Sequence, residues 1–102
     1  MKIYLFCESF PTTLLAIKMQ EAADSKGRTC HVKTFRAYDI EIMGSEADVI
    51  LIGSQFKSIL NSTKERLPNK PIAVIPMKDY GLIAGEAVLN MALKLYEEHQ
   101  NQ

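Results

Sequence analysis

The stretch KIYLFC at residues 2–7, followed by ESFPTT at residues 8–13, predicts a buried strand that leads directly into a helix. The strand ends at Cys7, and Thr12 or Thr13 can cap a helix that continues to about Lys26. Backbone N–H groups converge at such a helix start, where they bind anions and lower the pKa of a nearby thiol. Cys7 is therefore the first candidate for a functional residue.

Three more apolar runs complete the set of predicted strands. Two of them, Val49–Gly53 and Ile72–Ile75, are nearly continuous in apolar residues, as is the first run, Ile3–Cys7. Such runs are typical of strands that are buried on both faces of a parallel sheet. The remaining run, Cys30–Phe35, alternates with polar residues, which predicts a strand at the edge of the sheet.

Helical patterns fill the intervals between these strands. The first helix is expected to stop at Gly27, because glycine suits the left-handed conformation that follows a helix C-terminus. The other expected helices are Asp39–Ser45, Gln55–Leu67, which Pro68 terminates, and Gly85–His99.

The alternation of strands and helices predicts an α/β fold with a single domain over residues 1–102. We expect an open four-stranded parallel sheet in the order 2-1-3-4, with helices on both faces. In that order the chain reverses direction between the first and third strands, and ligands bind in the crevice at such a switch point. Cys7, Gly53-Ser54-Gln55 and the turn after Ile75 should meet there.

Composition excludes several classes of protein. Twelve basic and twelve acidic residues give a formal net charge of zero, which argues against a nucleic-acid partner. The longest apolar runs are too short to span a bilayer, and the N-terminus has no signal-peptide pattern. The two cysteines, Cys7 and Cys30, form no metal-ligand cluster. We expect a cytoplasmic protein with reduced thiols and with neither a metal nor a cofactor.

The position of Cys7 suits a thiol that attacks or carries a phosphoryl group, whereas Cys30 fits a small buried hydrophobe. Burial as a hydrophobe is also the alternative for Cys7 itself. A cysteine phosphatase needs an arginine six residues after its cysteine to grip the phosphate, and that position here is Thr13. A carrier of phosphate is therefore favoured over a hydrolase.

A set of short motifs spread over nearly the whole length supports the same chemistry. These motifs are Lys2-Ile3-Tyr4-Leu5-Phe6-Cys7, Leu14-Leu15, Lys18-Met19, Ala47-Asp48-Val49-Ile50-Leu51-Ile52-Gly53 with Gln55, Pro68-Asn69-Lys70-Pro71, Val74-Ile75, Tyr80-Gly81, Gly85 and Val88-Leu89.

In these motifs the chain resembles the IIB component of the lactose/cellobiose/chitobiose branch of the bacterial sugar phosphotransferase system. The resemblance implies that Cys7 is a phosphocysteine, which accepts phosphate from a phosphohistidine on the IIA component. It would pass the phosphate to a sugar held by the membrane IIC component. The resemblance also implies a shallow, exposed site, with Gln55 and the loop residue Tyr80 near the cysteine or the partner. The implied phosphate-binding loop consists of Glu8, Ser9, Phe10, Pro11, Thr12 and Thr13.

The loop after Cys7 departs from the family, which typically has small residues and a glycine there. Here Pro11 lacks an N–H, and Glu8 places a negative charge beside the future phosphate. One alternative is therefore a IIB-like binding or regulatory module with impaired phosphoryl transfer. A second alternative is a phosphatase-like thiol enzyme.

Overall fold

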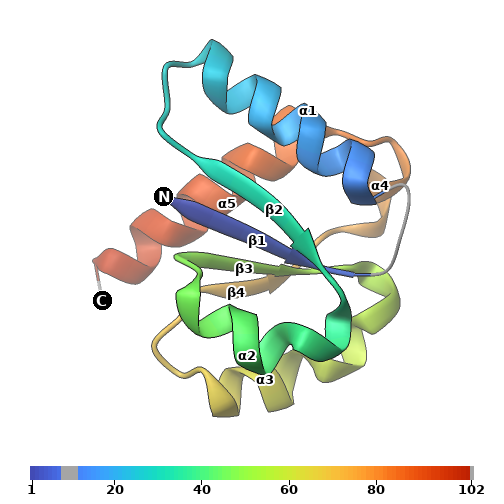
Figure 1. Cartoon of the computed structure of the whole chain (residues 1–102), viewed down its shortest axis with the longest axis vertical. Coiled ribbons are helices and arrows are strands. Elements are labelled where there is room, and N and C mark those ends of the chain that lie inside the picture. Colours follow the sequence, from blue (N-terminus) through green and yellow to red (C-terminus); the bar gives the residue numbers. More distant parts are fainter. Residues whose placement is uncertain (8–11, 102) are drawn as a thin grey trace.

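A computed structural model, which describes residues 1–7 and 12–101, contains one four-stranded parallel sheet. Its strands are β1 (Lys2–Phe6), β2 (His31–Phe35), β3 (Val49–Ile52) and β4 (Ile72–Val74). The strand order is β2-β1-β3-β4, as predicted, and all three pairings are parallel. Figure 1 shows the four strands pointing the same way, so that their carboxyl ends share one edge of the sheet.

The expected burial is confirmed for β1, β2 and β3. It was wrong for β4, where Ala73 and Val74 are only half-buried because this strand forms the other edge of the sheet. Every residue of β3 is buried, whereas no residue of β2 is fully buried. β2 lies at the edge, where it pairs only with β1 and its side chains are exposed or half-buried. Central parallel strands have no solvent-facing side, and this accounts for the unbroken apolar runs.

Helices cover both faces of the sheet (Figure 1). The long helices α1 (Thr12–Ser25) and α5 (Gly85–Gln100) pack together on one face, and the short helices α2 (Ile40–Met43) and α3 (Leu60–Arg66) lie on the other. Gly27 has a φ of 68°, which confirms the left-handed residue expected after the first helix.

Two of the predicted helical regions differ from the sequence-based expectation. The region predicted as Asp39–Ser45 combines α2 with two 3-10 turns, η1 (Ala37–Asp39) and η2 (Gly44–Glu46). The region predicted as Gln55–Leu67 starts with the 3-10 segment η3 (Ser54–Ile59), which is kinked at Phe56, before α3 begins. These regions are short or irregular, so their apolar residues show no sustained helical period.

A further helix, α4 (Met77–Gly81), occupies the segment that was expected to be a turn and a loop after Ile75. It has five residues, which is too short for a periodic pattern to be seen in the sequence. In Figure 1 it lies close to the start of α1, beside the carboxyl edge of the sheet.

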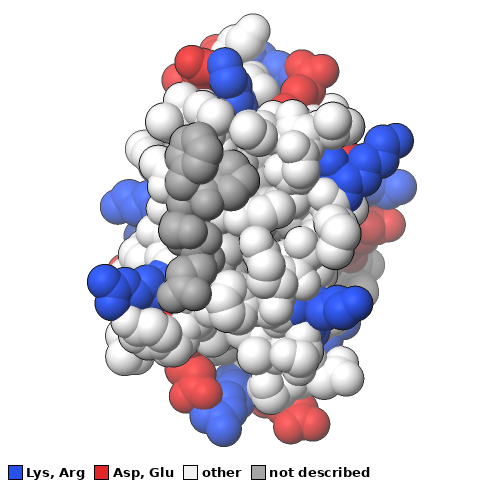
Figure 2. Space-filling model, turned by 90° about the vertical axis from the view of Figure 1, so that its right-hand side faces the viewer, with Lys and Arg blue, Asp and Glu red and all other residues white. Residues whose placement is uncertain are grey.

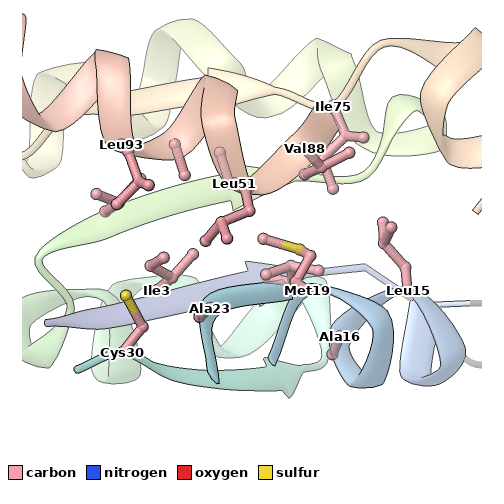
Figure 3. Close-up of a cluster of buried hydrophobic side chains, with 14 of the residues drawn as sticks. Ile3, Leu15, Ala16, Met19, Ala23, Cys30, Leu51, Ile75, Val88 and Leu93 are labelled. Atoms are coloured by element: carbon pink, nitrogen blue, oxygen red, sulfur yellow. The ribbon is translucent and has the colours of Figure 1, made fainter. Parts of the chain in front are cut away.

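The larger hydrophobic core fills the space between the sheet and the pair α1 and α5 (Figure 3). Side chains of α1 and α5 meet those of β1 and β3 there, and Cys30 belongs to this core, as expected. The fully buried members include Ile3, Leu5, Leu15, Met19, Ala23, Val49, Leu51, Ile75, Val88, Leu89 and Ala92. A second core on the opposite face contains Tyr4, Phe6, Ile40, Ala47, Ile50, Ile52 and Ile72. The two cores hold the sheet between them and fix where β1 ends.

Candidate functional site

Cys7 lies one residue beyond β1, at the carboxyl edge of the sheet, where the switch point was expected. Its backbone N–H donates to the carbonyl oxygen of Phe35 over 3.1 Å, so the sheet pairing continues past the strand end. Only 3% of Cys7 is exposed. The expectation of a shallow, exposed site was wrong for the thiol, because residues of three other elements surround it.

Gly53, the first residue after β3, packs directly against Cys7. A Cβ atom placed on Gly53 would stand 2.7 Å from the Cys7 Cβ and 3.0 Å from its Sγ. Real Cβ atoms do not come that close to other heavy atoms, so only glycine allows this approach. A Cβ atom on Gly53 would also lie 3.0 Å from Oε1 of Gln55. The side-chain amide of Gln55 therefore lies next to Gly53, the residue that packs against Cys7.

Thr12, the first residue of α1, contacts Cys7 from the helix side. The residue is 2% exposed, and its hydroxyl forms a hydrogen bond with the Cys7 side chain. The Thr12 Oγ1 also lies 2.6 Å from the hydroxyl of Tyr80. Thr12 therefore links Cys7 to Tyr80 of α4 through two hydrogen bonds.

Burial raises the pKa of the Cys7 thiol above its ordinary value of 9.0. The hydrogen bonds from Thr12 and from the backbone of Gly53 lower the pKa, but they do not compensate for the loss of solvation. The expectation of a lowered pKa was therefore wrong. A helix N-terminus favours the thiolate, yet in a site this buried the cost of desolvating a charge is larger.

The raised pKa predicts how stability depends on pH. Above pH 9.0 the unfolded chain releases the Cys7 proton while the folded chain keeps it, so the unfolded state binds fewer protons. The free energy of unfolding should then fall as pH rises from 9.0 toward the folded pKa, by at most about 1.4 kcal/mol per pH unit. Urea unfolding of the wild type and Cys7→Ala at a series of pH values measures this, because other titrating groups cancel in the difference. A difference that stays constant with pH would contradict the prediction.

A cavity of about 310 Å³ opens beside the thiol. Its lining includes Cys7, Thr12, Thr13, Thr34, Phe35, Arg36 and Asp39. Thr34, Phe35, Arg36 and Asp39 were not expected at the site from the sequence. The sheet order could have indicated them, because β2 is the neighbour of β1 and Phe35 pairs with Phe6. The residues that follow β2 must therefore lie beside Cys7.

Arg36 is the only Lys or Arg side chain among the described residues that line this cavity. Its guanidinium donates to the Tyr38 hydroxyl and stands 5.8 Å from the centre of the Tyr38 ring. A guanidinium is a strong partner for phosphate oxygens. Arg36, one residue after β2, thus lines the cavity together with the acidic residue Asp39, although the chain has no arginine at the position of Thr13.

The remaining predicted residues divide into three groups. Tyr80 is buried in α4, so the expected loop setting was wrong, but it does lie near the cysteine, to which Thr12 connects it. Gln55 and Thr13 are exposed near Cys7. Glu8, Ser9, Phe10 and Pro11 lie outside the described residues.

Figure 2 views the molecule from the side to which the strands point. Uncharged side chains fill most of the centre of this face, and Lys, Arg, Asp and Glu lie mainly toward its rim. A larger cavity of about 480 Å³ lies elsewhere, near the C-terminal end of α5, and it shares no lining residue with the cavity beside Cys7. Its size does not make it the better site, because its lining contains no cysteine, serine or threonine.

The fold and the sequence both match proteins of one kind. The family described as "PTS system, Lactose/Cellobiose specific IIB subunit" matches residues 2–91. The chain belongs to this IIB family. The fold and the family resemblance expected from the sequence are therefore confirmed, and the protein is a IIB component of the lactose/cellobiose type in the sugar phosphotransferase system.

Two relatives of this IIB protein come from Lactococcus lactis. They are the galactose-specific EIIB component of subsp. cremoris (strain MG1363) and the cellobiose-specific EIIB component of subsp. lactis (strain IL1403). Each is 35% identical over 91 residues, which cover 82% of this chain and 84% of the relative.

Solved structures support the same assignment. The cellobiose-specific IIB component of Borrelia burgdorferi has a TM-score of 0.81 and 25% identity, covering 97% of this chain and 94% of the other. The lactose-specific IIB domain of Streptococcus pneumoniae has a TM-score of 0.83 at 17% identity, covering 94% and 97%, and shows that the fold is shared. Among the described residues of the IIB protein, no helix is both long and apolar enough to cross a membrane.

Proposed function

We propose that this IIB protein carries phosphate on Cys7. It takes the phosphoryl group from a phosphohistidine of a IIA component and passes it to a sugar bound by a membrane IIC component, at the cytoplasmic side. The observation that carries the proposal is the thiol of Cys7 at the carboxyl edge of the sheet, beside a cavity lined by Thr12 and Thr13. The family supplies the class of reaction.

The transfer has two steps that balance in atoms and protons. In the first, the Cys7 sulfur attacks the phosphorus, the P–N bond to the histidine breaks, and the departing imidazole takes up the proton that the thiol loses. In the second, a sugar hydroxyl attacks the phosphorus, the P–S bond breaks, and the hydroxyl proton returns to sulfur. The raised pKa of Cys7 is compatible with this cycle, because the thiol keeps its proton until the basic imidazole is present.

Several groups are candidates to stabilise the phosphocysteine. Thr12 and Thr13 supply hydroxyls at the N-terminus of α1, whose dipole favours an anion. We assign Glu8, Ser9, Phe10 and Pro11 to the same phosphate-binding loop. Arg36 lines the cavity beside Asp39 and is the candidate cation for the phosphate, and the exposed Gln55 is a candidate contact for a partner protein.

Phosphorylation by a purified donor cascade tests the proposal. Phosphoenolpyruvate, the general phosphotransferase proteins and a IIA component of the lactose/cellobiose type should add one phosphoryl group, seen by intact-mass measurement. Cys7→Ser should form no thiophosphate, whereas Cys30→Ser, which alters the other buried thiol, should still accept the group.

An unmodified wild type under these conditions would refute the carrier function. It would favour the IIB-like binding or regulatory module with impaired phosphoryl transfer. Release of inorganic phosphate from an aryl phosphate, dependent on Cys7, would instead favour the phosphatase-like enzyme.

A further inference from the structure

Tyr80 reaches the site from a distant part of the chain. It is 6% exposed, and its hydroxyl lies 2.6 Å from Oγ1 of Thr12, a residue 68 positions away in the sequence. A buried tyrosine hydroxyl needs a hydrogen-bond partner, and here the partner is the threonine that also contacts Cys7. The tyrosine is therefore connected to the thiol through a single side chain.

When Cys7 is a thiolate or carries phosphate, the number of available protons decides which hydroxyl donates in the hydrogen bond between Thr12 and Tyr80. In either state the sulfur or the phosphate can only accept hydrogen bonds, and the Thr12 hydroxyl has one proton to give. If Thr12 donates that proton toward Cys7, the contact between Thr12 and Tyr80 requires Tyr80 to donate. Two donors in series strengthen each other in a buried setting.

We propose that Tyr80 is a positioning residue, whose hydroxyl donates to Thr12 and thereby holds the Thr12 hydroxyl toward the Cys7 sulfur. This inference rests on the proposed carrier function, which it deepens by naming the group that prepares Cys7 for attack. Tyr80 does not touch the reacting atoms, and it acts only through Thr12.

The backbone that carries Tyr80 is unusually constrained. At the end of α4, Ile83 N–H donates to the carbonyl of Tyr80 over 3.2 Å, and Ala84 N–H donates to that of Asp79 over 2.9 Å. These two bonds form a helix end that normally requires glycine at the left-handed position, yet Ile83 occupies it with a φ of 52°. A β-branched residue in this conformation is strained, and such strain persists only where the surroundings hold it.

The next contact shows what holds this turn. Gly85, the first residue of α5, is pressed so closely on the backbone of Lys18 in α1 that a Cβ would lie 2.6 Å from the Lys18 carbonyl carbon. α1 carries Thr12, and α4 carries Tyr80 directly before this junction. The packing therefore fixes the two hydroxyls relative to each other.

Titration of Cys7 in matched variants tests the proposal. The Cβ chemical shift of Cys7, followed by carbon NMR against pH, reports the thiolate at this residue alone. Tyr80→Phe keeps the ring and removes the hydroxyl, and it should lower the fraction of thiolate at a fixed alkaline pH by about threefold. Thr12→Val should lower it at least as much, while Thr12→Ser, which keeps a hydroxyl, should retain most of the wild-type value.

The double variant with both Thr12→Val and Tyr80→Phe shows whether Tyr80 affects Cys7 through Thr12 or independently of it. If Tyr80 acts through Thr12, Tyr80→Phe in the Thr12→Val background should cause no further change. Tyr96→Phe, at a half-buried tyrosine of α5, should titrate like the wild type. The charged groups Arg36 and Asp39, which line the cavity beside Cys7, are the same in every variant, so differences report the hydrogen bonds.

Two results would overturn the proposal: an unchanged titration in Tyr80→Phe, or fully additive effects in the double variant. The titration needs no partner protein. If the wild type accepts no phosphoryl group from the donor cascade, the carrier function fails, and the titration still decides whether Tyr80 orients Thr12.

Discussion

Gly85→Ala is expected to destabilise the protein by about 2 kcal/mol or more, although it adds a single methyl group. The new Cβ would stand 2.5 Å from the Cβ, 2.6 Å from the carbonyl carbon and 2.8 Å from the carbonyl oxygen of Lys18. Two of these atoms belong to the backbone of α1, so no side-chain rotation can relieve the contact and the two long helices must separate. Urea unfolding should show a lower midpoint with an unchanged slope.

Gly81→Ala is the matched control, because it makes the same chemical change a few residues earlier. A Cβ on Gly81 would meet no heavy atom within 4 Å, and Gly81 lies in a helix, where alanine is preferred. This variant should be as stable as the wild type, or more stable by up to about 1 kcal/mol. Equal losses in Gly81→Ala and Gly85→Ala would show that the contact with Lys18 does not limit the packing of α1 and α5.

Leu51→Ala should have the largest effect, a loss of about 2–5 kcal/mol in the free energy of unfolding. Leu51 is fully buried at the centre of β3, and Figure 3 shows it among the side chains between the sheet and the long helices. Truncation removes apolar contacts and leaves a cavity that a central strand, paired on both sides, cannot close by moving. Since single domains have about 5–15 kcal/mol of stability, this loss is a large part of the total.

Leu82→Ala supplies the comparison for Leu51→Ala. Leu82 is 69% exposed, so its truncation removes little buried surface and should change the stability by no more than about 0.5 kcal/mol. Thermal and urea unfolding of the two variants should therefore differ strongly. If Leu51→Ala lost as little as Leu82→Ala, the core shown in Figure 3 would not be the main source of stability.

The expected fold follows from local patterns that the structure confirms. Unbroken apolar runs at β1 and β3, and the alternating run at β2, indicated which strands are central and which is at the edge. Right-handed crossovers, together with the edge pattern of β2, favoured the strand order that is observed. The expectation was poorest at η3 and α4, because a short 3-10 segment and a five-residue helix have too few turns to show a period.

The sequence by itself determined that Cys7 lies at the end of the first strand and before a helix, because the patterns of these two elements are local and follow each other along the chain. The tertiary structure alone decided the chemical state of that thiol. Burial raises the pKa of the thiol although hydrogen bonds from Thr12 and the Gly53 backbone lower it, and this net direction is contrary to what a helix start suggests. The tertiary structure also decided that Tyr80 bonds to Thr12 and that Arg36 lines the cavity. The reason is physical: desolvation and hydrogen bonding depend on distances between elements far apart in the chain, and packing sets those distances.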